Sequence, residues 1–285
     1  MASVGLGRAL LERETCRYGY SQMAFRGPEA DLTQPYLAFL GTTETLGPFV
    51  TRPFPYLVSE ACDLECVNLG VRNAGPDVFL NDPELLRLAQ GAEAVVLEVM
   101  GVANLSNAFY QVHPRRNDRF IRAHQALYDL APGLDTTDIH FTGHLLKEVT
   151  RLAPKAAPAL IKSLQATWSE RMKQLIAAFD VPVHVVRFAT QETPVETTRL
   201  IEPLMLASLV SVAASVTRIT PSDEALAEGT DEMFFAKHEA RAAHVMLSNA
   251  AHHEAAETIA KVIRRKIKEP APDRRGPLKG SSRGA

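Results

Sequence analysis

The fold is decided by residues 36–47, which read YLAFLGTTETLG. The apolar run that ends at Gly41 is the pattern of a strand buried on both faces of a sheet. The turn that follows, residues 41–47, holds three threonines and a glutamate between two glycines. Such a turn either binds an anion or exposes a nucleophile, or it is a threonine-rich helix cap without chemistry.

Four further segments have strand character, and helices are expected between them. The strands are residues 65–70, 94–100, 181–188 and 215–219, and the helices are residues 53–61, 82–90, 195–209 and 253–268. Strands that alternate with helices at this spacing predict parallel βαβ units, whose ligands gather at the carboxyl ends of the strands. The sequence therefore predicts an α/β fold with a parallel sheet.

The domain organisation follows from length and pattern. The chain has 285 residues, of which 46% are hydrophobic, enough to bury the core of one elaborated α/β domain. We expect an irregular arm over residues 1–34, the α/β domain over residues 35–268 and a disordered tail over residues 269–285. Residues 118–179 have a mainly helical pattern, and we expect them to form a helical insertion in that domain.

Charge and ligand spacing limit the partners of the chain. The 31 Lys and Arg residues nearly balance the 33 Asp and Glu residues, so no overall field favours nucleic acid or an anionic membrane. No run approaches the ~18 apolar residues of a membrane span, and charges interrupt the opening apolar segment, so we expect a cytoplasmic protein.

Cys62 and Cys66 lack the further ligands that zinc needs. His140 and His144 lack the intervening glutamate of a zinc protease, and we interpret them as an exposed helix face, so no metal and no other cofactor is expected.

Candidate site residues follow the other strands. Gly70, after the second strand, either supplies an N–H to an oxyanion or is a plain turn glycine. Asn104, after the third strand, either donates its amide to an oxyanion or bonds its own loop. Asn249 with His252 and His253, expected just before the last helix, offers a base and an orienting partner for a nucleophile.

These places, in this order, resemble the sequence blocks of the SGNH, or GDSL, hydrolases. The first block of that family, Gly-Asp-Ser-x-Thr-x-Gly, is similar to residues 41–47, with Thr43 in place of the nucleophilic serine. The second-block glycine corresponds to Gly70, the third block to residues 101–104, and the Asp-x-x-His block to residues 249–252, with His253 as a rival base. The resemblance implies a three-layer, flavodoxin-like α/β fold and an esterase or acyltransferase site.

A longer signature is more specific. Residues 106–120 read SNAFYQVHPRRNDRF and resemble the signature of an uncharacterised bacterial domain family, whose members also carry Thr-Glu-Thr in the first block. Residues 41–50 and 67–82 resemble the same family. The resemblance implies a fold and no established activity.

Two departures from the SGNH pattern weaken the case for hydrolysis. Thr43 keeps a hydroxyl, but its extra methyl group restricts rotation and crowds a carbonyl. Asn249 stands where an aspartate would stabilise an imidazolium, and loss of that carboxylate costs ~10⁴ in turnover. Glu44, beside Thr43, either supplies the acid or is a solvated carboxylate.

A cationic cluster is the other unusual feature, and it consists of His113, Arg115, Arg116 and Arg119. Arginine forks match the geometry of phosphate, sulfate and carboxylate groups. The cluster therefore either binds a charged sugar or nucleotide-linked substrate, or forms salt bridges with Asp118 that fasten the insertion to the sheet.

We interpret the chain as an SGNH-like hydrolase or acyltransferase that acts on an acylated, carbohydrate-linked substrate. The expected catalytic residues are Thr43 as nucleophile, His252 or His253 as base, and Gly70 and Asn104 as oxyanion donors. Contacts to a small-molecule or glycan substrate are expected from Thr42, Glu44, Asn107, His113, Arg115, Arg116 and Arg119. The alternative is a non-catalytic relative that binds an anionic glycan or a partner through the three arginines. The sequence does not predict the oligomeric state.

Overall fold

A five-stranded parallel sheet forms the centre of the protein. The structure is a computed structural model that describes residues 15–189 and 200–268. The sheet has the order β4-β3-β5-β8-β9, and each neighbouring pair is parallel. Its strands are β3 (Tyr36–Gly41), β4 (Glu65–Gly70), β5 (Ala94–Glu98), β8 (Val183–Phe188) and β9 (Ser215–Ile219). This order is that of flavodoxin-like doubly wound sheets, so the predicted α/β class and parallel sheet are confirmed.

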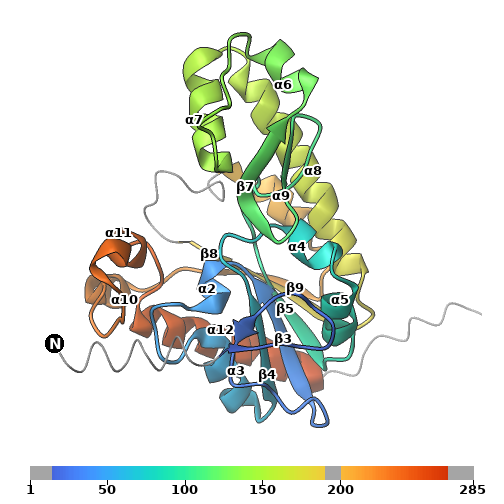
Figure 1. The fold of residues 1–285 in the computed structure, drawn as a ribbon. Coiled ribbons are helices and arrows are strands. Elements are labelled where there is room, and N and C mark those ends of the chain that lie inside the picture. The colour runs from blue at the N-terminus through green and yellow to red at the C-terminus, as the bar shows by residue number, and fades with distance from the viewer. Residues whose placement is uncertain (1–14, 190–199, 269–285) are drawn as a thin grey trace, which may run out of the picture.

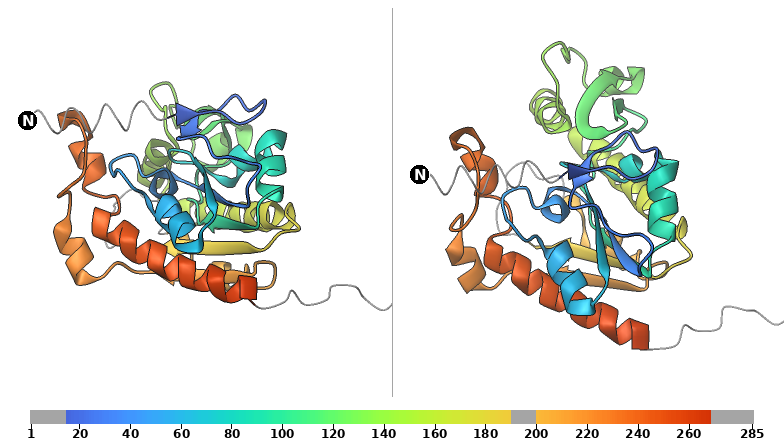
Figure 2. Two further views of the ribbon diagram at one scale, coloured as in Figure 1. Left: turned by 90° about the horizontal axis from the view of Figure 1, so that it is seen from below. Right: turned by 60° about the horizontal axis from the view of Figure 1, so that its bottom comes forward.

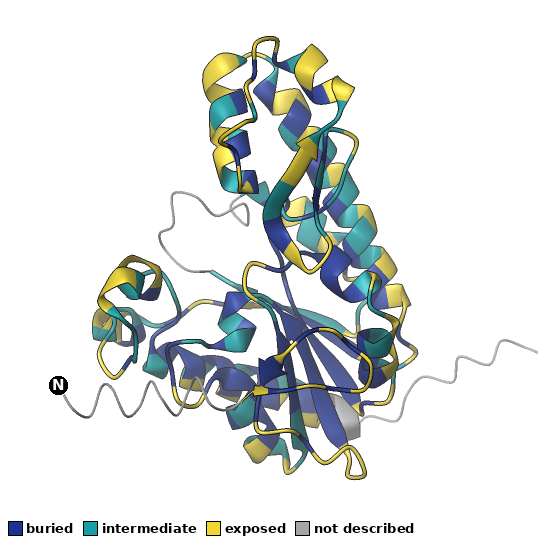
Figure 3. Cartoon of the chain, viewed as in Figure 1, coloured by how far each residue is buried: buried dark blue, intermediate teal, exposed yellow. Residues whose placement is uncertain are grey.

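The interior strand β3 contributes to both sides of the sheet. Leu37 and Phe39 belong to one hydrophobic cluster, whereas Ala38 and Leu40 belong to another. Alternate side chains of a strand point to opposite faces, so each face of β3 is covered. All six residues of β3 are buried, which Figure 3 shows as dark blue strands at the centre of the molecule.

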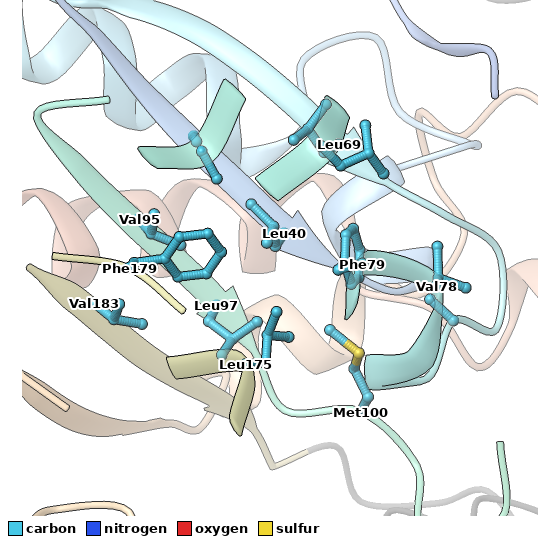
Figure 4. Packing of buried hydrophobic residues seen from close by; sticks show 14 of the residues in the cluster. Leu40, Leu69, Val78, Phe79, Val95, Leu97, Met100, Leu175, Phe179 and Val183 are labelled. Carbon is cyan, nitrogen blue, oxygen red and sulfur yellow. The ribbon is translucent and has the colours of Figure 1, made fainter. Parts of the chain in front are cut away.

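Helices cover the two faces of the sheet. On one face, α3 (Phe54–Cys62) and α12 (Asn249–Lys268) pack together against β3 and β5 (Figure 2). On the other face lie α4 (Pro76–Leu80), α5 (Pro83–Gln90) and the second half of α8 (Ala157–Ala177), whose side chains meet Leu40, Leu69 and Leu97 (Figure 4). The predicted cap of the helix that begins at Pro83 is confirmed, because the Asp82 carboxylate accepts two N–H groups of its first turn.

The insertion starts with a β-hairpin that the sequence analysis did not predict, and its helices begin only after residue 123. β6 (Tyr110–His113) pairs with β7 (Arg116–Ala123), and α6 (Gln125–Leu130) and α7 (Thr142–Leu152) follow. Buried and half-buried residues alternate along β6, the period of a strand packed on one face. The hairpin and these helices enclose a third hydrophobic cluster and stand at the carboxyl ends of the sheet strands (Figure 1).

Helix α8 connects the insertion with the sheet. Its first half contributes Leu160 and Leu164 to the cluster of the insertion, and its second half contributes Trp168 and Met172 to the cluster on the sheet. The Trp168 indole N–H donates to the Met100 carbonyl at 2.7 Å. One continuous helix therefore belongs to both cores.

Two helices differ from prediction. The helix expected over residues 195–209 is short where it is described, since α9 spans Pro203–Ala207 and residues 190–199 lie outside the described ranges. The last helix, α12, begins at Asn249, four residues before the expected start. Ser248 is the reason, because its hydroxyl accepts the Ala251 N–H at 3.1 Å and so caps the helix.

Smaller elements complete the chain. They are β1 (Thr15–Cys16), β2 (Phe25–Arg26), α2 (Thr43–Leu46), α10 (Asp223–Glu228), η2 (Lys237–Glu239) and α11 (Ala240–Ala243). The first fourteen residues of the expected arm and the whole expected tail lie outside the described ranges. Within those ranges, none of the helices has the length and apolar character that a membrane span requires.

Arg26, at the end of β2, holds the segment that follows α2. This buried side chain donates to the carbonyls of Leu46, Gly47, Val50 and Thr51. These carbonyls belong to a segment between two helices, where backbone partners are few. The N-terminal hairpin thereby fixes the connection between α2 and α3.

We predict that Arg26→Met lowers the free energy of unfolding by about 3 kcal/mol, because hydrogen bonds from a charged group are lost and buried carbonyls are left without a donor. Chemical denaturation measures the change. Arg17→Met is the matched control, because Arg17 is exposed and donates to the Gln22 carbonyl at the surface. Equal stability of the two variants would contradict this role of Arg26.

His252 lies in the interface between α3 and α12. It is 1% exposed, its Nδ1 accepts the Phe54 N–H at 3.2 Å, and its ring stacks on Phe54 with the ring centres 6.0 Å apart. Burial is the main reason that the pKa of His252 is lowered to about 3, and the charges of Arg26 and His253 contribute. The imidazole is therefore neutral and serves as a hydrogen-bond acceptor in the core.

This placement predicts a pH dependence of stability. The unfolded chain binds a proton at the ordinary histidine pKa of about 6.5, whereas the folded chain resists it, so stability is complete above that pH and is lost as the pH falls towards 3. Between about pH 6 and about pH 4, the wild type should lose about 1.4 kcal/mol per pH unit more than His252→Asn. The asparagine keeps an acceptor for the Phe54 N–H but cannot be protonated. Parallel stability curves from denaturant titrations would rule this out.

Candidate functional site

A cavity of about 370 Å³ opens at the carboxyl ends of the sheet strands. Its walls come from the turn after β3, the loops after β4 and β5, the end of β8 and the start of α7. The lining residues include Thr42, Thr43, Glu44, Asn73, Glu98, Asn104, Asp118, Phe141, Thr142, His144 and Arg187. Strands β3 and β5 are neighbours whose connections run in opposite directions, and ligands of doubly wound sheets bind at this switch point.

Glu98, the last residue of β5, fixes the turn after β3. Its buried carboxylate accepts the N–H and hydroxyl of Thr42, at 2.7 and 2.5 Å, and those of Thr45, at 3.1 and 2.6 Å. Burial raises the pKa of Glu98, although each of these hydrogen bonds acts in the opposite direction. Gly41 is required beneath it, because a Cβ atom there would lie 2.0 Å from the Thr45 hydroxyl.

Thr43 presents its hydroxyl to the loop after β4. Thr43 Oγ1 accepts the Asn73 N–H at 3.1 Å and lies 3.4 Å from the Asn73 side-chain oxygen. Asn73 has a positive φ of 50°, a conformation that asparagine adopts more readily than most residues. The sequence analysis did not identify Asn73 as a site residue.

A polar network continues from Asn73 to the insertion. The Asn73 amide donates to Asp118 Oδ2 at 3.1 Å, and the Asn73 carbonyl accepts the amide of Asn104 at 2.9 Å. Asn104 in turn accepts the hydroxyl of Thr142 at 2.9 Å. Asp118 Oδ1 is enclosed, and among the described residues it has no hydrogen-bond partner. Asp118 itself lines the cavity, so its carboxylate group belongs to the cavity wall.

Gly70 does not line the cavity. Its N–H donates to Asn68 Oδ1 at 3.0 Å, and a Cβ atom at this position would lie 2.2 Å from the Leu46 backbone nitrogen. The glycine therefore permits α2 to pack on β4. Its N–H is already bonded to Asn68 and does not face the cavity as an oxyanion donor, contrary to expectation.

Neither expected base lines the cavity. His252 faces α3, as described above, and His253 is exposed on α12. The expectation that these histidines precede the helix is wrong, because Ser248 starts the helix earlier and turns His252 into the core. The amide of Asn249 lies 3.3 Å from the Glu232 carboxylate.

Two other expected substrate contacts have backbone partners. The Asn107 side chain accepts the Phe109 N–H at 2.8 Å and donates to the Leu105 carbonyl at 3.0 Å, so it shapes the entry to the hairpin. Glu44 lines the cavity, and its carboxylate accepts the Leu247 N–H at 3.1 Å.

The cationic cluster is divided between two places. Arg119 stacks on Phe141, with its guanidinium 4.4 Å from the ring centre, beside the cavity. His113, Arg115 and Arg116 line a separate groove with Arg72. The alternative of salt bridges with Asp118 finds no support among the described residues, where that carboxylate bonds to Asn73.

Two further side chains at the cavity were missed as site residues. His144, in the first turn of α7, lines the cavity, and its Nε2 lies 3.9 Å from Glu148 Oε1. Arg187, at the end of β8, donates to the Ile201 carbonyl at 3.0 Å, and burial followed by the charge of Arg218 lowers its pKa. Both depend on which elements meet at the sheet edge, which no local pattern reveals.

We searched the described ranges for side-chain clusters that could bind a metal ion. Groups of three or more His, Cys, Asp or Glu side chains that could hold a metal ion do not occur there.

Comparison with known proteins gives a family and a distant structural likeness. Curated protein sequences give no match. Among solved structures, an acetyl xylan esterase (Est2A) from the rumen bacterium Butyrivibrio proteoclasticus is similar with 12% identity and a TM-score of 0.39, over 86% of this chain and 67% of that one. That likeness is too distant to bear on activity. A family model described as a domain of unknown function (DUF6473) matches residues 1–267, and the chain therefore belongs to the DUF6473 family.

Proposed function

We propose that the cavity is the active site of an SGNH-like hydrolase or acyltransferase for an acylated, carbohydrate-linked substrate. The observation that carries the proposal is the position of Thr43, which lies just after the carboxyl end of β3 in the wall of the cavity. The carboxamides of Asn73 and Asn104 follow the two neighbouring strands. The flavodoxin-like strand order supports an SGNH-like, three-layer arrangement.

In this proposal, Thr43 Oγ attacks the acyl carbonyl of the substrate. The amide protons of Asn104 and Asn73 stabilise the oxyanion that develops. The base takes the Thr43 hydroxyl proton and passes it to the sugar oxygen, which leaves as an alcohol. The acyl-threonine then passes its acyl group to water or to a second alcohol, whose proton returns through the base to Thr43.

His144 is the base in this scheme. Among the histidines that the structure describes, it is the one that lines the cavity. The carboxylate of Glu148, one turn further along α7, lies 3.9 Å from His144 Nε2 and can orient the imidazole. Arg151 lowers the pKa of Glu148, so this carboxylate stays charged. The insertion would thus supply the base that α12 does not.

The acceptor and ring surfaces of the cavity fit a sugar. Asp118 lines the cavity, and its carboxylate can accept a hydroxyl hydrogen of the sugar. Phe141 is 42% exposed and offers an apolar ring face beside these polar groups.

Thr43→Ala should lower hydrolysis of p-nitrophenyl acetate and acetylated xylan by about 10³-fold or more, because the attacking hydroxyl is lost. Thr43→Ser should retain turnover, since it keeps the hydroxyl and removes the crowding methyl group. Initial rates for the three proteins at equal concentration measure this. Equal rates for wild type and Thr43→Ala would overturn the assignment.

His144→Gln should lower the same rates by about 10²- to 10⁴-fold, the range for loss of a general base. His253→Gln is the matched control, because His253 is exposed on α12 and lies outside the cavity lining. A loss in His253→Gln as large as that in His144→Gln would refute the role of His144.

A second function has its own supporting observation. The Thr43 hydroxyl is held by Asn73, and within the described ranges no imidazole is bonded to it. Such a site would bind a glycan without cleaving it. In that case the wild type would show no turnover, and calorimetry would detect xylan binding that weakens on Asp118→Asn.

A further inference from the structure

An open groove of about 680 Å³ lies on the other side of the loop that carries Asn73. Three segments line it: the β1–β2 hairpin, the loop after β4 and the turn between β6 and β7. The cationic residues of the groove are Arg72, His113, Arg115 and Arg116, and the remaining lining residues are Gln22, Met23, Ala24 and Val71. The described lining thus contains three guanidinium groups and no carboxylate.

The arginines of the groove form no ion pairs with the residues that the structure describes. None of the ion pairs among the described residues includes Arg72, Arg115 or Arg116. All three are exposed, and Arg72 lies 5.8 Å from the ring centre of Phe49. The chain has a net charge of −2, so a groove with unpaired guanidinium groups is a local feature. Like charges held together are unfavourable unless an anion joins them.

The groove is held in shape by a buried asparagine. Asn117, 0% exposed, accepts the N–H groups of Gly75 and Val78, both at 3.1 Å, and donates to the His113 carbonyl at 3.0 Å. It therefore ties the hairpin turn to the loop that carries Arg72. The Arg115 N–H donates to His113 Nδ1 at 3.2 Å, which leaves Nε2 of a neutral His113 as a donor. A site fixed before binding loses less entropy on binding.

We propose that this groove binds the acidic groups of an anionic polysaccharide. Arginine forks pair with carboxylate and sulfate groups in two-point contacts. Single-stranded nucleic acid is a worse fit, because proteins bind it by stacking bases on aromatic side chains and the described lining of the groove has none. The open shape of the groove suits a chain segment.

The groove and the cavity are adjacent through two short stretches of chain. Arg72 lines the groove and Asn73 the cavity, and on β7 Arg116 lines the groove and Asp118 the cavity. A polysaccharide bound in the groove would bring neighbouring sugars to the cavity. That the bound polymer is also the substrate rests on the proposed function. Binding in the groove does not depend on it.

Calorimetry on the full chain tests the proposal by measuring the binding of polygalacturonate. Dextran sulfate is a second anionic probe, and neutral dextran is the uncharged control. The wild type should bind both anionic probes and not neutral dextran. Binding should weaken when ionic strength rises from about 0.05 to about 0.2 M, because exposed charges are screened. The double variant Arg115→Ala/Arg116→Ala should bind at least about tenfold more weakly.

Arg122→Ala is the matched control, because Arg122 is an exposed arginine on the same hairpin outside the groove lining. Unchanged binding by the double variant, an equal loss in Arg122→Ala, or tighter binding of oligo(dT) than of polygalacturonate would overturn the proposal. Thr43→Ala should bind polygalacturonate as the wild type does. A wild type that binds polygalacturonate but shows no hydrolysis would therefore contradict the proposed function alone.

Discussion

The site depends on one buried carboxylate. Glu98 ends β5 and receives four hydrogen bonds from the turn that follows β3. These hydrogen bonds offset part of the cost of burying the carboxylate, although burial still raises its pKa. Because Glu98 holds the flanking threonines, Thr43 between them is directed at the loop after β4.

A second constraint joins the insertion to the sheet through asparagines. Asn117 binds the loop after β4 from the hairpin, and Asn73 and Asn104 continue the contacts to Asp118 and Thr142. A Cβ atom on Gly75 would lie 1.6 Å from the Asn104 carbonyl oxygen, so these loops also touch through backbone. The positions of the cavity wall and of the groove are therefore set by the same few contacts.

Local patterns predicted the elements whose signals are local. The strands were recognisable because their apolar runs are contiguous, and Asp82 marked a helix start through its own capping bond. Glu98 was missed because one glutamate in an apolar run has no partner in sequence, and its role arises only when β3 and β5 pair. The hairpin was missed because polar residues and arginines obscure the alternation of Tyr110 and Val112.

The histidines show the limit of sequence reasoning at the site. Spacing relative to the last helix suggested His252, but the face that a helical residue presents depends on where the helix starts and what packs against it. Ser248 decides the first and Phe54 the second. His144 drew attention only as a spacing motif, because its position at the cavity follows from the packing of an insertion about 100 residues after Thr43.

The shared helix α8 has a consequence for how binding properties can diverge among related chains. Its 21 residues span about 31 Å. The insertion packs on the first half of α8 and provides one wall of the cavity, from residues 141–144, which we call the roof. Substitutions in that outer half can tilt or reshape the roof while the inner half keeps the sheet intact. A change in the direction of α8 would therefore move the part of the cavity wall that the insertion provides while the strands of the sheet stay in place.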